Sequence, residues 1–121
     1  MTPSQDKIEQ LKAQYPDRAL LLVEAMDADD KVMSFVMTGP TKDEYKFFVG
    51  KLLAAREIKD EQDKLWSMRA AVENAALAQI RWPDRDECKK AFDARPEMVD
   101  GFHEELRKAA GANIELRSRK L

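Results

Sequence analysis

The segment TGPTKDEYKFF, at residues 38–48, constrains the fold more than any other, because the hydrophobic periodicity of the chain changes there within a few residues. Before it, apolar residues alternate as in a β-strand. After it, they recur every three or four positions, as in an amphipathic helix. Gly39 and Pro40 end the strand, and Thr41 followed by Glu44 has the spacing of a helix capping box. A β-structured N-terminal part is therefore expected to join a helical remainder near residue 41.

Two short apolar runs on the N-terminal side of this junction predict a β-hairpin. The runs RALLLVEAM and KVMSFVMT flank the tetrapeptide DADD at residues 27–30, which reads as a solvated turn. In the second run, Met33, Phe35 and Met37 alternate with other residues and are expected to pack on helices. The first run is apolar almost throughout, so it is expected to be the more buried strand.

Five helices are predicted from caps, apolar stripes and prolines, at residues 5–14, 42–56, 60–81, 86–94 and 97–110. The second helix carries a stripe of Tyr45, Phe48, Val49, Leu52 and Leu53. The third has a shared face of Leu65, Met68, Val72, Ala76 and Ile80. A joint is expected between these two helices, near residues 57–60. The predicted fold class is mainly α (α+β), with an N-terminal β-hairpin packed on a bundle of about four to five helices.

Length and composition set the broad class. A chain of 121 residues, 44% hydrophobic and 36% charged, is expected to form one domain over residues 1–111, with a flexible basic tail at 112–121. The net charge of −2 gives no general attraction to nucleic acid. The longest apolar run is far shorter than the roughly 20 residues of a membrane span, so no membrane is expected as a partner. A single cysteine and a polar N-terminus indicate a cytoplasmic protein.

No catalytic, cofactor or metal site is expected from the residues. His103 is the only histidine and has no serine motif around it, so it reads as a surface residue. Cys88 has no signature of a nucleophile and reads as structural. The acidic cluster at 27–30 lacks the glycine and glutamate of a calcium loop. An enzyme is therefore the weakest of the functional classes, and it would have to use a pocket around His103 or Cys88.

Four residues are the candidates for contact with a partner protein. Trp66 and Trp82 stand near the ends of the third helix, where an indole can pack its ring and leave its N–H in water. Tyr45 and Met98 join them, because aromatic and methionine side chains suit adaptable binding surfaces. The alternative for each of them is a place in the core or at its edge.

The order of motifs resembles small tail assembly chaperones of tailed bacteriophages. The matching residues are Pro40, Thr41, Glu44 and Tyr45 at the second helix start, then Pro83, Phe92 and Pro96 before the last helix, and Gly111 at its end. The resemblance spans residues 20–111. It rests on short, cap-like motifs, which are also common signals of helix ends.

The resemblance implies a non-enzymatic role in phage or prophage tail morphogenesis. It implies binding to the tape measure protein, recruitment of tail tube subunits, a location in the cytoplasm of the bacterial host, and absence from the mature virion. Whether the protein forms a homo-oligomer is left open. The competing hypothesis is a small phage-encoded adaptor or inhibitor that binds a host protein, which would need the same kind of apolar surface.

Overall fold

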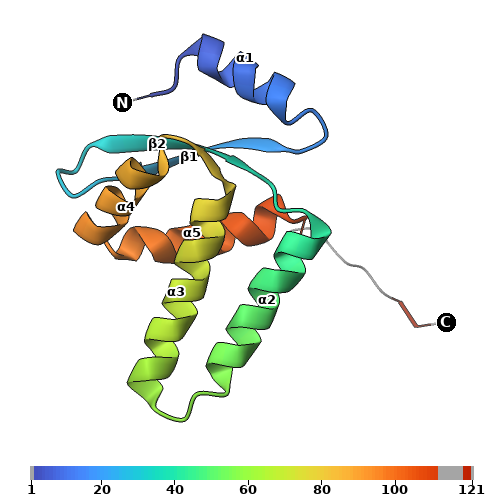
Figure 1. The fold of residues 1–121 in the computed structure, drawn as a ribbon, viewed down its shortest axis with the longest axis vertical. Coiled ribbons are helices and arrows are strands. Elements are labelled where there is room, and N and C mark those ends of the chain that lie inside the picture. Colours follow the sequence, from blue (N-terminus) through green and yellow to red (C-terminus); the bar gives the residue numbers. More distant parts are fainter. Residues whose placement is uncertain (1, 112–118, 121) are drawn as a thin grey trace.

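The computed structural model describes residues 2–111, 119 and 120. Within them the chain forms an α+β fold of five helices and one three-stranded antiparallel sheet (Figure 1), so the predicted fold class is confirmed. The elements are α1 (Gln5–Gln14), β1 (Leu20–Met26), β2 (Val32–Thr38), α2 (Lys42–Arg56), α3 (Glu61–Gln79), β3 (Ile80–Trp82), α4 (Arg85–Ala94) and α5 (Glu97–Ala109). The tail predicted at 112–121 falls mostly on residues 112–118 and 121, which lie outside the described residues.

The sheet has the order β1-β2-β3, and the predicted hairpin is confirmed by the pairing of β1 with β2 from Leu20↔Thr38 to Met26↔Val32. The prediction that the first strand is the more buried was wrong. Phe35 and Met37 of β2 are fully buried, whereas Leu22 of β1 is 57% exposed. A central strand has neighbours at both edges, but β1 has a strand on one side only, and this position outweighs its apolar composition.

The acidic turn between the two strands is solvated, as predicted. The Asp27 carboxylate accepts hydrogen bonds from the backbone N–H groups of Asp29 and Lys31, at 2.9 and 3.0 Å. Arg95, between α4 and α5, donates to the backbone oxygen of Asp27 at 2.7 Å. The turn is therefore tied to the helical part of the molecule.

The third strand was missed, and this corrects the predicted helix at 60–81. The helix ends at Gln79, and Ile80–Trp82 pair with β2 instead. Trp82 precedes Pro83, and a residue before proline avoids the helical conformation. The free edge of β2 offers backbone partners to the extended segment, so the chain leaves the helix to complete the sheet.

The core lies between the sheet and α3, α4 and α5. Phe35 of β2 contacts Phe92 of α4 and Phe102 of α5, with ring centroids 6.2 and 5.1 Å apart, and the two helical rings are 5.5 Å apart. Helix α1 lies on the opposite side of the sheet (Figure 1), where its Leu11 is buried. The prediction that the alternating face of the second strand packs on helices is confirmed.

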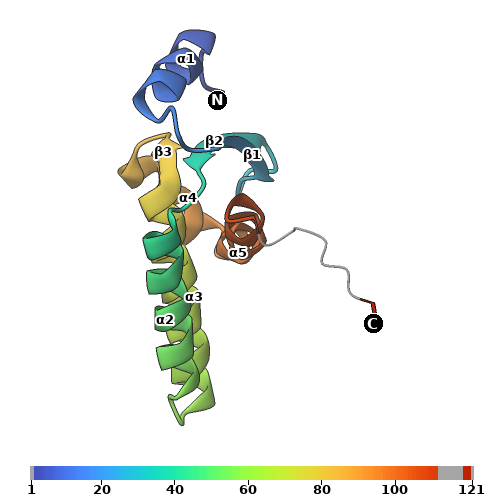
Figure 2. The same cartoon turned by 90° about the vertical axis from the view of Figure 1, so that its right-hand side faces the viewer.

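Helices α2 and α3 form an antiparallel pair, called the arm here, that projects away from the sheet (Figures 1 and 2). The predicted capping box starts it: Glu44 N–H donates to Thr41 Oγ1 at 3.2 Å, and Thr41 N–H donates to Glu44 Oε1 at 2.8 Å. The predicted joint is also confirmed, because the chain leaves helical structure after Arg56 and re-enters it at Glu61, with Asp60 as the cap.

The predicted apolar stripes of the arm are correct at most positions and wrong at Leu53 and Leu65. Phe48 and Leu52 of α2 and Val72 of α3 are buried, but Leu53 and Leu65 are more than half exposed. The outer half of the arm extends beyond the sheet (Figure 2), where each helix has one neighbour instead of several. An apolar residue there has no third element to pack against.

Candidate functional site

A groove with a volume of about 820 Å³ runs along the arm. We call it the α2–α3 groove. Its lining from α2 and the segments beside it comprises Pro40, Asp43, Glu44, Tyr45, Phe47, Phe48, Lys51, Ala54, Ala55 and Ile58. Its lining from α3 comprises Ser67, Ala70, Ala71, Asn74, Ala75, Ala78 and Gln79, and α5 contributes Leu106. From Asp43 to Ile58 the helical rise gives a length of about 22 Å.

The groove exists because α5 packs on only one side of the arm. His103 of α5 meets the Phe48 ring edge-on at 5.8 Å, and Arg69 of α3 donates to the Pro96 backbone oxygen at 2.9 Å at the start of α5. In Figure 2, α5 lies to one side of the two helices, and the other side of their outer half is uncovered. Along that side α3 presents mainly alanine, so the α3 wall is low.

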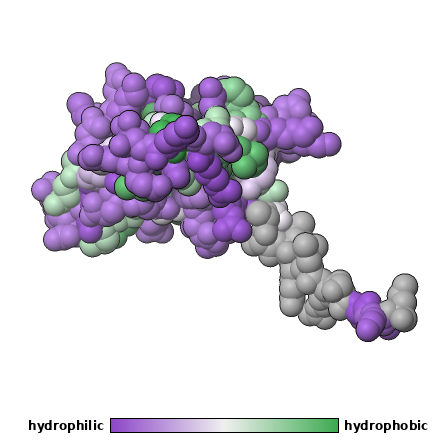
Figure 3. Space-filling view, turned by 90° about the horizontal axis from the view of Figure 1, so that it is seen from below, coloured by the Kyte–Doolittle hydropathy of each residue, from purple (hydrophilic) through white to green (hydrophobic). Residues whose placement is uncertain are grey.

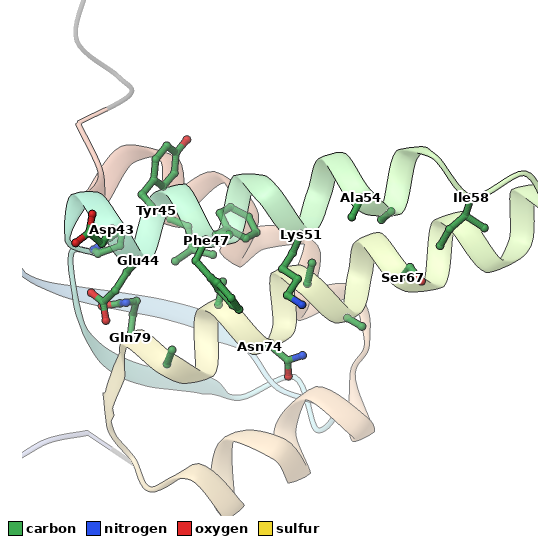
Figure 4. A pocket seen from close by; sticks show the side chains of 18 residues that line it. Asp43, Glu44, Tyr45, Phe47, Lys51, Ala54, Ile58, Ser67, Asn74 and Gln79 are labelled. Atoms are coloured by element: carbon green, nitrogen blue, oxygen red, sulfur yellow. The ribbon is translucent and has the colours of Figure 1, made fainter.

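Phe47 is the most prominent apolar side chain of the groove. It is 69% exposed and extends from α2 toward α3 (Figure 4), whose part of the groove lining is mainly alanine. Seen from the tip of the arm, the surface is mainly hydrophilic with small hydrophobic patches (Figure 3). Phe47 and the alanines of α3 thus form the uncovered apolar part of the groove.

The sheet end of the groove is closed by a polar network. Arg18 donates to Glu44 Oε1 at 2.7 Å, to Gln79 Oε1 at 2.6 Å and to the Gly39 backbone oxygen at 2.8 Å. Gln79 also accepts from the fully buried Thr38 hydroxyl at 2.8 Å. These bonds join the loop before β1, the end of β2 and both helices of the arm. They hold the inner end of the groove in one geometry.

The fold changes the ionisation of Glu44, a carboxylate of the groove lining. Partial burial acts to raise its pKa, but the Thr41 backbone bond, the Gln79 contact and the Arg18 charge together outweigh burial. The pKa of Glu44 is therefore lowered from its usual value of 4.5. The carboxylate is charged at neutral pH and is already occupied by Arg18.

The four partner-binding candidates from the sequence are not brought together. Tyr45 lines the groove at its inner end, with its ring 6.1 Å from Phe48. Met98 is only 6% exposed and belongs to the core. Trp66 is 55% exposed and lies outside the groove lining, with the Arg69 guanidinium 5.4 Å from its ring centre. Trp82 is half-buried in β3.

Sequence reasoning missed the residues that shape the groove. Phe47 sits beside the predicted stripe, and the predicted face of the third helix includes only Ala76 among the alanines of α3. A usable signal was present: Ala71, Ala75 and Ala78 recur at helical spacing and leave one helix face without large side chains. A helix face of such small side chains leaves a hollow unless another helix packs against it.

The two side chains considered for catalysis have structural positions. Cys88 is fully buried, and burial raises the pKa of its thiol to about 11, so it is protonated at neutral pH. His103 is half-buried against Phe48 instead of lying free on the surface. Among residues 2–111, 119 and 120, no three or more histidine, cysteine or acidic side chains are grouped to hold a metal ion. None of the helices described is both long enough and apolar enough to cross a bilayer.

Fold and groove together define a small α+β protein with a two-helix arm, one face of which is open. No protein-family model, no curated protein and no solved structure matches the chain.

Proposed function

We propose that the protein is a non-enzymatic tail assembly chaperone of a tailed bacteriophage or prophage. In this proposal it binds helical segments of the tape measure protein in the α2–α3 groove and helps to recruit tail tube subunits. The observation that carries the proposal is the uncovered apolar face of the arm, with the exposed Phe47 beside the low alanine wall of α3. The identity of the partner rests on the resemblance of residues 20–111 to such chaperones.

The dimensions of the groove suit a helix. Its length of about 22 Å corresponds to about four helical turns. Alanine on the α3 wall allows a third helix to approach to the 8–10 Å at which packed helix axes commonly lie. Such a helix would place its apolar stripe between Phe47 and the α3 wall, which is the helix-in-groove mode of recognition.

A chaperone for a long helical protein needs this kind of surface. It must cover apolar stripes that would otherwise aggregate, and it must release them when the tail assembles. A shallow, partly polar groove gives moderate affinity, because only part of the partner helix becomes buried. The proposed function therefore needs no group that performs chemistry.

The test is co-expression of the full chain with the tape measure protein encoded nearby, followed by co-purification. We expect the partner to stay in the soluble fraction and to co-purify with the wild-type protein. Phe47→Asp should abolish this, because it places a charge in the apolar groove. Leu53→Asp is the matched control: Leu53 is also an exposed apolar residue of α2, but it does not line the groove.

Two results would overturn the proposal. If neither the tape measure protein nor the tail tube subunit binds at about 50 μM, a weak limit for specific association, the host-directed adaptor replaces the chaperone. If Leu53→Asp abolishes binding while Phe47→Asp does not, the partner uses the other side of the arm.

A further inference from the structure

Lys51 places a cation in the middle of the α2–α3 groove. Its side chain extends from α2 into the groove (Figure 4), and its ammonium lies 5.2 Å from the centre of the Phe47 ring. Within residues 2–111, 119 and 120, no carboxylate lies within 4 Å of this ammonium. Lys51 is thus a cation of the groove wall that lies beside the Phe47 ring and has no carboxylate next to it.

Asn74 stands across the groove from Lys51, on α3 (Figure 4). Its side-chain amide makes no hydrogen bond to another described residue. The Lys51 ammonium and the Asn74 amide N–H₂ are both donors, and a carboxylate is the side chain that can accept from both. The middle of the groove is therefore suited to one negative charge.

The inner end of the groove carries acidic side chains instead of a cation alone. Glu44 is paired with Arg18, and Asp43 is exposed and has no ion pair with another described residue. Along α2, Asp43 and Lys51 are eight residues apart, or about 12 Å. A polyanion lying along the groove would meet these two carboxylates, so nucleic acid is a poor occupant. A helix with a single acid opposite Lys51 meets no such repulsion.

We infer that the groove selects an amphipathic helix whose apolar stripe is interrupted by one acidic residue, and that Lys51 and Asn74 bind its carboxylate. This inference rests on the proposed function and names the chemistry of the helical partner. The acid sets the register: a one-turn slide of the partner helix would leave both the carboxylate and Lys51 unpaired beside apolar side chains. The apolar contacts supply affinity, and the charge supplies position.

Three synthetic peptides test the inference directly. Each is an amphipathic helix of about 20 residues, long enough to fill the groove. They share one leucine and alanine stripe and differ at a single central stripe position, which is Glu, Gln or Lys. Calorimetric titration of each peptide uses the full chain as wild type, as Lys51→Glu and as Lys46→Glu. Lys46 is the matched control, because it is an exposed lysine of the same helix that does not line the groove.

The wild-type protein should bind the Glu peptide about three- to tenfold more tightly than the Gln peptide, and bind the Lys peptide most weakly. Lys51→Glu should reverse the order of the Glu and Lys peptides, whereas Lys46→Glu should preserve the wild-type order. Asn74→Ala should reduce the preference for Glu over Gln. Raising the salt concentration should shrink all these differences.

Several outcomes would overturn the inference. Equal affinities for the three peptides, or the same order in wild type and Lys51→Glu, would show that the charge does not select the helix. If Lys51→Glu instead changes self-association in sedimentation experiments, the occupant is a second copy of this chain. Failure of all three peptides while the tape measure protein still co-purifies would overturn this inference alone. Failure of both measurements would overturn the proposed function as well.

Discussion

At the residue scale, burial and not residue type decides what a side chain contributes. Phe47 and Phe102 are both phenylalanines on helices, yet one is 69% exposed and the other lies between Phe35 and Phe92 in the core. We expect Phe102→Ala to lower the free energy of unfolding by about 3–5 kcal/mol, because it leaves a cavity. Phe47→Ala should change it by less than about 0.5 kcal/mol. Urea denaturation of both variants measures the contrast, and a wild-type midpoint for Phe102→Ala would contradict the core described here.

The pH dependence of stability gives a second prediction at the same scale. The pKa of Glu44 is lower in the folded protein than its usual 4.5, so its contribution to stability is fully present above about pH 4.5. That contribution is lost as the pH falls through the lowered folded value. Glu44→Gln should therefore destabilise the protein at pH 7, and its stability should fall less steeply than that of the wild type between pH 5 and pH 3.

Thermal melts across this pH range test the prediction. Glu104→Gln is the control, because Glu104 is an exposed glutamate of α5 far along the chain from the Arg18 network. Parallel stability curves for wild type and Glu44→Gln would show that Arg18 and Thr41 do not hold the Glu44 carboxylate as described.

At the scale of the elements, the arm has two unequal halves. The buried residues of α3 are Val72, Ala76, Leu77 and Gln79, all in its sheet-side half. The outer half carries the exposed Leu65 and Trp66, and α2 adds the exposed Leu53. A segment with few buried contacts opens locally at lower free energy than the core.

Hydrogen exchange should reveal this difference. We expect the backbone amides of residues 62–66 to exchange well before those of 72–79 under native conditions. The amides in the first turns of α3 can exchange after local opening, whereas those of residues 72–79 exchange only when the core opens. Equal protection of the two segments would mean that the arm is covered along its whole length, for example by self-association, and a dilution series would then remove the protection of the outer half.

At the scale of the whole molecule, the sheet and the helices packed on it hold a two-helix arm whose open face is mainly apolar. Binding of a helix in the α2–α3 groove should bury apolar surface, which predicts a negative heat-capacity change. Calorimetry at several temperatures measures it, with Phe47→Asp as the control. Total affinity should fall only modestly with salt, since one ion pair contributes. A heat-capacity change near zero, or a steep loss of affinity with salt, would point to a mainly polar interface.

The sequence alone determined the local structure of this protein. The capping box at Thr41 and Glu44, the acidic turn after Met26 and the joint before Asp60 all lie where their patterns predicted, because caps and turns depend on residues a few positions apart. For the same reason the five helices and the hairpin could be read from periodicity and prolines.

Tertiary structure alone decided which faces are covered. The sequence around Leu22 does not indicate that its strand lies at the edge of the sheet. The sequence around Ile80 likewise does not indicate that β2 has a free edge to pair with. Phe47 and Phe48 are adjacent in the sequence, but α5 packs over one of them only, which leaves the other beside the alanines of α3. The groove is made by contacts between residues distant along the chain, and these depend on how the elements assemble, not on the pattern within any one of them.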